Sequence, residues 1–315
     1  MSQFQLNFDS ENEKGRPLGF IHGGSHEGEI VYLNSVKHKT KSKIDNGEIA
    51  TLIQALYRNM GNKINMKMME RIREAILDRK RPASRELAQL YDMAIKMLDH
   101  GKNREILLGE EGKLNPMFDA TRERDVQMVC GMSGSGKSTY VAGLCKVYKR
   151  QYPSNKVILF SNKPSDPVFD NLEFVERVVI NDDLIKDPIT LNELSSAFVI
   201  FDDVECQTNK DVDKELTRLA DLILQQGRSY KTSFAYVSHQ SNNYKATRNI
   251  LNEAHSITIF PAMVTKYSLK YLLGTYFGFD KDEIKRLSRL PSRWVTICKA
   301  PSIVLYSGGA YLTDN

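Results

Sequence analysis

The sequence predicts an α/β fold in which a mainly parallel sheet is flanked by helices. Three observations lead to this prediction. Unbroken apolar runs such as 157–160 and 197–201 have the length and composition of strands buried on both faces. Stretches with apolar residues at 3–4 spacing separate these runs, as crossover helices do between parallel strands. A glycine-rich segment at 131–136 lies between an apolar run and a helical pattern.

The glycine-rich segment has the spacing of a P-loop, Gly-x-x-x-x-Gly-Lys-Ser. Glycines let the backbone curl so that successive N–H groups point at phosphate oxygens, and the following helix adds the positive end of its dipole. In this pattern the lysine reaches the β- and γ-phosphates and the serine hydroxyl ligates Mg²⁺. We therefore expect Ser138 to hold Mg²⁺ and the whole loop to bind ATP. The expected nucleotide-binding residues are Gly131, Met132, Ser133, Gly134, Ser135, Gly136, Lys137, Ser138 and Thr139.

A second acidic site follows the apolar run 197–201, which carries Asp202 and Asp203 at its end. A strand of this kind brings a carboxylate to the edge of the sheet where phosphates bind. We expect Asp202 to ligate Mg²⁺ together with the P-loop serine, since Mg²⁺ takes few protein carboxylates. Asp203 can polarise the attacking water as a general base. Glu205 is the competing candidate for that role.

Two further candidates surround the run 233–237. Ser238, His239 and Gln240 follow it, and Gln240 or His239 can sense the γ-phosphate and position water. Arg228 lies at a helix end directly before the run. An exposed arginine there can enter a neighbouring subunit's site as an arginine finger. An ordinary solvated arginine is an equal alternative.

The remaining elements follow from local patterns. Two β-like runs, 18–21 and 29–33, enclose a glycine-rich turn and predict a hairpin. Apolar 3–4 spacing predicts helices across 47–100. We assign 1–115 to a mainly helical accessory region and 116–315 to the P-loop domain, with 101–121 as the join. Further strands are expected at 174–180, 256–260, 294–298 and 303–306, and further helices at 141–152, 212–223, 265–277 and 280–288.

Composition sets broad limits on the chain. The 315 residues are 41% hydrophobic and 26% charged, and no apolar run approaches the ~18 residues of a membrane span. The four cysteines are far apart, which fits a reducing compartment. The net charge is +5, and residues 241–315 hold 10 basic and 5 acidic side chains. This excess is compatible with a polyanionic partner, although solvated faces explain most such excesses.

The ordered set of motifs resembles the genome-packaging ATPases of nucleo-cytoplasmic large DNA viruses. These are the poxvirus-type packaging ATPases within the FtsK–HerA superfamily of P-loop NTPases. The resemblance covers about residues 120–310 and implies an additional-strand, RecA-like fold. It also implies a ring of subunits that hydrolyse ATP at their interfaces and translocate double-stranded DNA into a preformed capsid. The segments that carry it are Gly131–Ser138, Val199–Asp203, Gln226–Ser229, Phe234–Gln240 and Ser292–Val295.

The resemblance implies partners and roles as well. The implied partners are double-stranded DNA bound without sequence preference, further copies of this chain, and capsid or portal-vertex proteins, with no membrane span. The implied location is the assembly site in the host cytoplasm or the virion. Carried over, Asp202 is the Walker B acid, Asp203 the base and Arg228 the finger. Many superfamily members have Glu at the position of Asp203, which keeps Glu205 open. Candidate DNA contacts in the basic C-terminal quarter are Lys245, Arg248, Lys266 and Lys270.

Two other functions compete with a motor. A nucleoside or polynucleotide kinase has a similar P-loop, but it needs an arginine-rich lid over the phosphates, which the sequence lacks. A nucleotide-gated assembly protein would bind ATP with little turnover. The intact set of Lys137, Ser138 and Asp202 argues against this second alternative.

Overall fold

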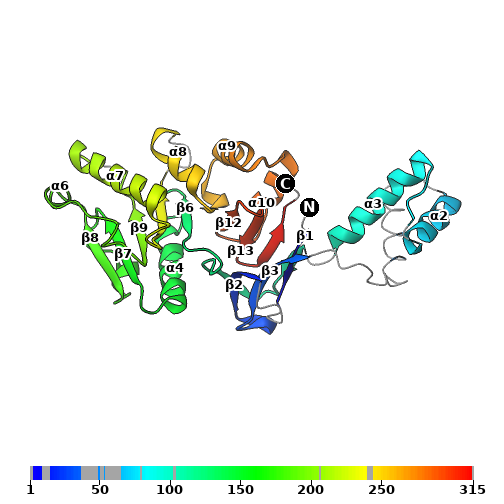
Figure 1. Ribbon diagram of the computed structural model, residues 1–315, viewed down its shortest axis with the longest axis horizontal. Coiled ribbons are helices and arrows are strands. Elements are labelled where there is room, and N and C mark those ends of the chain that lie inside the picture. Colours follow the sequence, from blue (N-terminus) through cyan, green and yellow to red (C-terminus); the bar gives the residue numbers. More distant parts are fainter. Residues whose placement is uncertain are drawn as a thin grey trace. The chain divides into compact units, whose positions relative to one another are not determined.

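The computed structural model describes residues 3–8, 15–36, 49, 53, 65–78, 80–101, 104–205, 207–239 and 244–313. The chain forms two compact units (Figure 1). One comprises Met1–Gln5 and Ser35–Glu105, and the other comprises Leu6–Asn34 and Ile106–Asn315.

The larger unit is built on a ten-stranded sheet with the order β4-β14-β13-β12-β11-β6-β10-β9-β7-β8. Neighbouring strands from β11 to β8 are parallel, whereas β12, β13 and β14 pair antiparallel. The predicted α/β class with a mainly parallel sheet is therefore confirmed. The strands are β4 (Glu105–Leu107), β6 (Val126–Cys130), β7 (Lys156–Ser161), β8 (Val175–Val179), β9 (Ala197–Asp202), β10 (Ser233–Ser238), β11 (Ser256–Ile259), β12 (Val295–Cys298), β13 (Ile303–Tyr306) and β14 (Gly309–Leu312).

The central strands β6, β9 and β10 are buried along their whole length. Successive side chains of a strand point to opposite faces of the sheet. On β9, Phe198 and Ile200 belong to the core on one face, while Val199 and Phe201 belong to the core on the other. Apolar partners on both faces explain why this strand is an unbroken apolar run.

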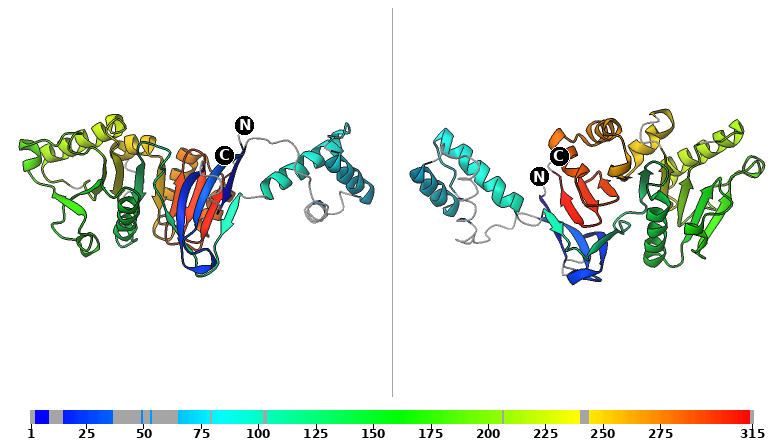
Figure 2. Two further views of the ribbon diagram at one scale, coloured as in Figure 1. Left: turned by 60° about the horizontal axis from the view of Figure 1, so that its bottom comes forward. Right: turned by 180° about the vertical axis from the view of Figure 1, so that it is seen from behind.

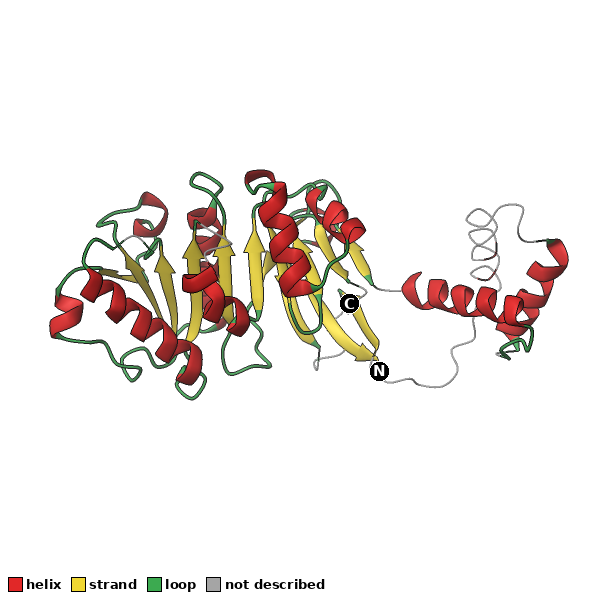
Figure 3. Cartoon of the chain, turned by 90° about the horizontal axis from the view of Figure 1, so that it is seen from above, coloured by secondary structure: helices red, strands yellow, loops and turns green. Residues whose placement is uncertain are grey.

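Helices cover both faces of the large sheet (Figure 3). The cores assign α4 (Lys137–Gln151) and α5 (Pro167–Asp170) to one face and five other helices to the opposite face. The helices of the opposite face are α6 (Asp183–Lys186), α7 (Lys210–Gln226), α8 (Tyr244–Glu253), α9 (Lys266–Phe277) and α10 (Lys281–Ser288). No helix within the described residues has the length and apolarity needed to span a membrane.

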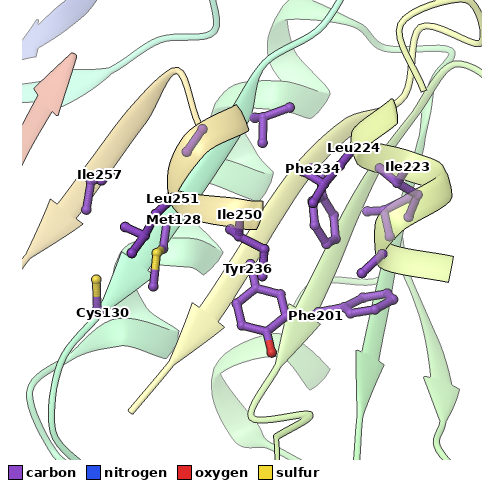
Figure 4. Packing of buried hydrophobic residues seen from close by; sticks show 14 of the residues in the cluster. Met128, Cys130, Phe201, Ile223, Leu224, Phe234, Tyr236, Ile250, Leu251 and Ile257 are labelled. Carbon is purple, nitrogen blue, oxygen red and sulfur yellow. The ribbon is translucent and has the colours of Figure 1, made fainter. Parts of the chain in front are cut away.

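The packing of α7 and α8 on the sheet is shown in Figure 4. Aromatic side chains of β9 and β10 meet aliphatic side chains of both helices, including Ile223 and Leu224 of α7 and Ile250 and Leu251 of α8. Leu216, Leu219 and Ile223 recur at helical spacing and give α7 its buried face. This packing of α7 and α8 against one face of the sheet fixes the positions of β9 and β10. Both strands end at the same edge of the sheet as the P-loop.

A smaller sheet has the order β1-β3-β2-β5. The expected hairpin is confirmed as β2 and β3, and β5 extends it through the pair Phe20 and Asn115. The amide of Leu114 donates to the carbonyl of Ser307 at 2.8 Å, so this sheet adjoins the β13–β14 turn (Figure 2). The strands are β1 (Gln3–Asn7), β2 (Arg16–His22), β3 (Ile30–Val36) and β5 (Lys113–Pro116).

The boundary drawn from sequence at residue 115 differs from the division seen in the structure. The hairpin and β5 belong to the P-loop unit because they pair with one another and pack against it. The ring of Phe20 packs against the core under α4, and the Arg150 guanidinium lies 5.3 Å from its centre. The segment 101–121, expected to be a join, contributes β4 and β5 to the two sheets.

The smaller unit contains the helices α2 (Met66–Leu77) and α3 (Arg85–Gly101). Apart from Gly101, both fall within the stretch 47–100 that was predicted to be helical. Of the residues of this stretch before Asn65, only 49 and 53 are described, and both are helical. Among the described residues of this unit, one core cluster is formed by Ile49, Met69, Ile72, Ile76, Leu90 and Ala94.

Candidate active site

The P-loop connects β6 to α4, as the sequence predicts. Gly134 and Gly136 have φ angles of +75° and +105°, which side-chain-bearing residues rarely adopt. A Cβ atom at Gly131 would lie 2.7 Å from the hydroxyl of Ser135 and 2.9 Å from the ring of Phe260. Glycine is therefore needed at these three positions for the loop to curl, which aims backbone N–H groups at a bound phosphate.

Lys137 opens α4, and its side chain folds back into the curl of the loop. Its ammonium donates to the carbonyl oxygens of Gly131 at 2.7 Å and Met132 at 3.2 Å. Burial lowers the pKa of this ammonium, and the nearby carboxylates of Asp203 and Asp202 oppose the shift. The charge is thus held at the place where phosphate oxygens bind, among carbonyls that they can replace.

Asp202 ends β9 at the same edge of the sheet as the P-loop. The pairing of β9 with β10 and of β10 with β6 brings Asp202, Ser238 and Cys130 to neighbouring strand ends. The carboxyl is 2% exposed, and burial together with the charge of Asp203 raises its pKa to about 6. A cation at this place would favour the ionised form.

The donor set at this edge fits Mg²⁺. Within the described residues, neither the carboxylate of Asp202 nor the half-buried hydroxyl of Ser138 makes a hydrogen bond to another residue. One carboxylate and one hydroxyl are hard oxygen donors, and Mg²⁺ completes its shell with water and phosphate oxygens. Asp202 and Ser138 are therefore the residues that could hold the ion.

Asp203 lies next to Asp202 in a left-handed conformation, with φ at +54°. Its carboxylate lies 2.9 Å from Nε2 of His239 and 3.5 Å from the ammonium of Lys163. Its backbone carbonyl accepts a hydrogen bond from the side-chain amide of Asn162 at 3.1 Å. These contacts fix the carboxylate at the mouth of the site.

His239 lies between the carboxylate of Asp203 and the ammonium of Lys137. Its Nε2 atom faces Asp203, and its Nδ1 atom lies 3.2 Å from the ammonium of Lys137. An imidazole that accepts from Lys137 through Nδ1 carries its proton on Nε2, the atom that faces the Asp203 carboxylate. The sequence offered His239 and Gln240 as phosphate sensors. The structure brings His239 into the site, whereas Gln240 lies outside the described residues.

Glu205, the competing base, has a different environment. Its carboxylate accepts a hydrogen bond of 2.6 Å from the hydroxyl of Ser238, and burial raises its pKa. It also lines a cavity of about 300 Å³ beneath α7, next to Tyr236 and Asp213. The geometry therefore points Glu205 toward the helix layer and Asp203 toward the P-loop lysine.

Arg228 lies at the opposite edge of the sheet. It precedes the first residue of β10, whereas the P-loop follows the last residue of the parallel strand β6. Its guanidinium is exposed and forms an ion pair with Glu123, which precedes β6. It does not contact the P-loop of its own chain, so a role as a finger could be exercised only in another subunit and stays a prediction.

Arg293 is a site residue that the sequence singled out only as part of a resembling segment. It precedes β12, whose antiparallel pairing with β11 brings its start to the P-loop edge. The guanidinium donates to the carbonyl of Ser135 at 2.9 Å and to that of Gly134 at 3.2 Å. A single arginine just before a strand of this edge is the only sequence signal that could have marked it.

The candidate DNA contacts are distributed over two helices. Lys266 and Lys270 are exposed on α9, beside Tyr267, which is 76% exposed. Arg248 lies on α8, and nothing is described of the side chain of Lys245. Contact of these residues with DNA stays a prediction.

Comparison with known proteins finds a matching family model and a relative. Residues 127–220 match a family model described as RNA helicase. Uncharacterized protein V3 of the Sputnik virophage is 35% identical over 219 residues, which are 67% of this chain and 85% of the virophage protein. The chain belongs to the V3 family. The segment that matches the RNA helicase model runs from β6 through the P-loop and β9 into α7, and so it contains both expected nucleotide-binding elements.

Solved structures with some similarity include two proteins in complex with ATP analogues. The genome packaging NTPase B204 of Sulfolobus turreted icosahedral virus 2, in complex with AMPPCP, has a TM-score of 0.41 at 11% identity and covers 59% of this chain and 98% of its own. The pCW3 conjugation coupling protein TcpA, with ATPgS, has a TM-score of 0.45 at 10% identity and covers 97% and 80%.

Proposed function

We propose that this P-loop NTPase is an ATP-driven motor that translocates double-stranded viral DNA into a preformed capsid. The observation that carries hydrolysis is the chain of contacts from Lys137 through His239 to Asp203. These contacts join the phosphate-binding lysine to the Asp203 carboxylate, which follows β9. Both groups therefore lie where one γ-phosphate can interact with them. The DNA substrate and the capsid rest on the motif resemblance.

In this proposal each residue has one task. The P-loop amides and Lys137 bind the β- and γ-phosphates, and Asp202 with Ser138 holds Mg²⁺, which neutralises charge on the transferring phosphoryl group. Asp203 accepts a hydrogen bond from the attacking water, and its proton on reaction. His239 holds Asp203 in place through Nε2 and senses the lysine through Nδ1.

The wider assignments belong to the same proposal. Copies of the chain form a ring in which Arg228 of one subunit completes the site of the next. The ring acts with capsid or portal-vertex proteins at the assembly site in the host cytoplasm or in the virion. The subunits contact the phosphates of the DNA backbone and not the bases. The affinity for DNA therefore falls steeply with salt concentration and has no sequence preference.

The test is the rate of phosphate release from ATP with and without double-stranded DNA. We expect DNA to stimulate hydrolysis by the wild type and Lys137→Ala to abolish it. Lys146→Ala is the matched control, because Lys146 is an exposed lysine on the same helix and should hydrolyse normally. Transfer of phosphate to a nucleoside or a DNA end would support a kinase. Absence of turnover in every assembled state would support an assembly protein.

A helicase is a second candidate because residues 127–220 match the RNA helicase model. Single-stranded RNA in the same assay separates the two. Stimulation by RNA together with unwinding of an RNA duplex would contradict the packaging motor.

The trans role of Arg228 has its own test. Mixing Arg228→Ala with Asp203→Asn subunits creates some interfaces that regain both groups. We expect hydrolysis to recover in part. Activity that stays at the level of the single variants, in rings shown to contain both, would refute the finger.

A further inference from the structure

A cavity of about 200 Å³ opens on one flank of the P-loop. Its wall begins at Gly136 and Thr139, where the loop enters α4, and continues along the helix to Val147. Phe260 and Trp294 close it from the neighbouring strands of the sheet. The residues proposed to act in hydrolysis do not line this cavity, apart from the P-loop residue Gly136 and Thr139 after it.

The order of strands decides which part of a nucleotide can reach the cavity. The P-loop follows β6, and the acids Asp202 and Asp203 lie on one side of it, across β10 and on β9. Phe260 follows β11 and Trp294 precedes β12, which lie on the other side. A nucleotide that directs its γ-phosphate toward the acids therefore directs its base toward the cavity.

The walls of the cavity are aromatic and held in place. The ring of Tyr140 lies 5.1 Å from that of Trp294 and 6.3 Å from that of Phe260. The hydroxyl of Tyr140 makes hydrogen bonds of 2.8 Å with Thr296 and 3.1 Å with Thr258, so the ring cannot turn out of the wall. Such surfaces stack on a planar base, which is a sequence-tolerant source of affinity.

Gly143 leaves room for a ligand. It is an exposed residue one turn after Tyr140 that lines the cavity, and a Cβ atom added to it meets nothing within 4 Å. The helix would gain stability from alanine at this position. The free space beside α4 therefore depends on glycine, a residue with low helix propensity.

One polar group at the rim can read a base. Asn115 of β5 lines the cavity, and its amide nitrogen makes only a 3.3 Å hydrogen bond to the carbonyl of Lys113. Its amide oxygen is free to accept within the described residues. A carboxamide pairs well with the adjacent donor and acceptor of adenine. The small sheet would then contribute to the nucleotide site through β5.

We propose that this cavity receives the base of the nucleotide whose phosphates the P-loop binds, and that Asn115 selects adenine. The inference rests on the proposed function, because it concerns the same nucleotide site. Gly143 sets the width of the cavity, and Trp294 and Tyr140 supply the stacking surface.

Trp294 is a built-in probe because it is the only tryptophan of the chain. We would titrate the full-length protein with ADP, CDP, GDP and pyrophosphate, none of which offers a γ-phosphate for hydrolysis, and record tryptophan emission. ADP should change the emission, whereas pyrophosphate should compete with ADP and leave the emission unchanged. Equal responses to ADP and pyrophosphate would overturn the inference.

Variants at Gly143 and Lys146 make a matched pair on α4. Gly143→Leu fills the cavity and should weaken ADP binding about tenfold, or about 1.4 kcal/mol, without changing pyrophosphate binding. Lys146→Leu adds the same side chain at an exposed position outside the cavity lining and should bind ADP like the wild type. Asn115→Ala should remove the preference for ADP over GDP. Unchanged ADP affinity in folded Gly143→Leu would overturn the inference.

The two proposals fail separately. Normal ADP and pyrophosphate responses without DNA-stimulated hydrolysis would remove the motor and keep the base site. DNA-stimulated hydrolysis with an ADP response equal to that of pyrophosphate would remove the base site and keep the motor.

Discussion

The two flanks of the P-loop differ in almost every physical property. On the side of β10 and β9 the loop meets ionisable groups, namely Asp202, Asp203, His239 and Lys163. On the side of β11 and β12 it meets rings fixed by buried hydroxyls, and the one ionisable group in contact with the loop there among the described residues is the Arg293 guanidinium. Charged groups can stabilise or accept a charge, while rigid apolar walls can only bind and exclude water. We therefore expect hydrolysis and the proposed base recognition to depend on different strands, so that a variant on one flank leaves the other activity intact.

The largest expected effect separates the two candidate bases. Asp203→Asn keeps the size and the left-handed backbone that asparagine tolerates, and should lower kcat about a hundredfold or more. Glu205→Gln should change kcat little, because the Glu205 carboxylate faces Ser238. Steady-state ATP hydrolysis measures both. A larger loss in Glu205→Gln would assign the base to Glu205.

The next effect is on stability and concerns Asp202. Its folded pKa is raised to about 6 from an ordinary value of 3.8, so between these values the folded state holds the extra proton and its stability falls as pH rises. Above about pH 6 the full penalty, about 2–3 kcal/mol, is present. Asp202→Asn removes it, so the metal-free variant should be the more stable protein at pH 8, with the difference disappearing near pH 4.

Urea unfolding in EDTA at pH 4, 6 and 8 measures this difference. Asp183→Asn is the control, because that carboxylate is 74% exposed and should show no such trend. Equal unfolding free energies of Asp202→Asn and wild type at all three pH values would contradict the burial of an ionisable group on this flank.

The smallest effect is expected on the aromatic flank. Tyr140→Phe keeps the ring but loses hydrogen bonds to Thr258 and Thr296, which should cost about 0.5–1.5 kcal/mol of stability for each bond. Because no proton moves through this hydroxyl, kcat at saturating ATP should be unchanged. Urea unfolding and steady-state kinetics on one preparation measure both. A fall in kcat comparable with that of Asp203→Asn would erase the distinction between the flanks.

Much of the acidic flank can be predicted from sequence, because each group follows a long buried run. Unbroken apolar runs predict the buried strands β6, β9 and β10. The P-loop, Asp202 and His239 are then found at or directly after the carboxyl ends of these strands. The bridge from His239 to Lys137 cannot be read in this way, since it depends on the rotamers of residues 102 positions apart.

On the aromatic flank the sequence predicts the strands β11 and β12, at 256–260 and 294–298, but not the cavity beside them, for a physical reason. It depends on pairings between short strands far apart in sequence, such as β5 with β2 and β12 with β11. Four-residue strands give little alternation to recognise, and β14 and α8 were not expected at all. Arg293 reaches the P-loop only because the antiparallel β12 starts at its edge.

In the proposed site a nucleotide lies across the P-loop with its phosphates toward Asp202 and its base toward Trp294. Photolabelling with 8-azido-ATP, followed by mapping of the modified peptides, tests this placement directly. We expect labels within 139–147 and 293–296, competed by ATP. Labels confined to 161–166, beside the acids, would contradict it.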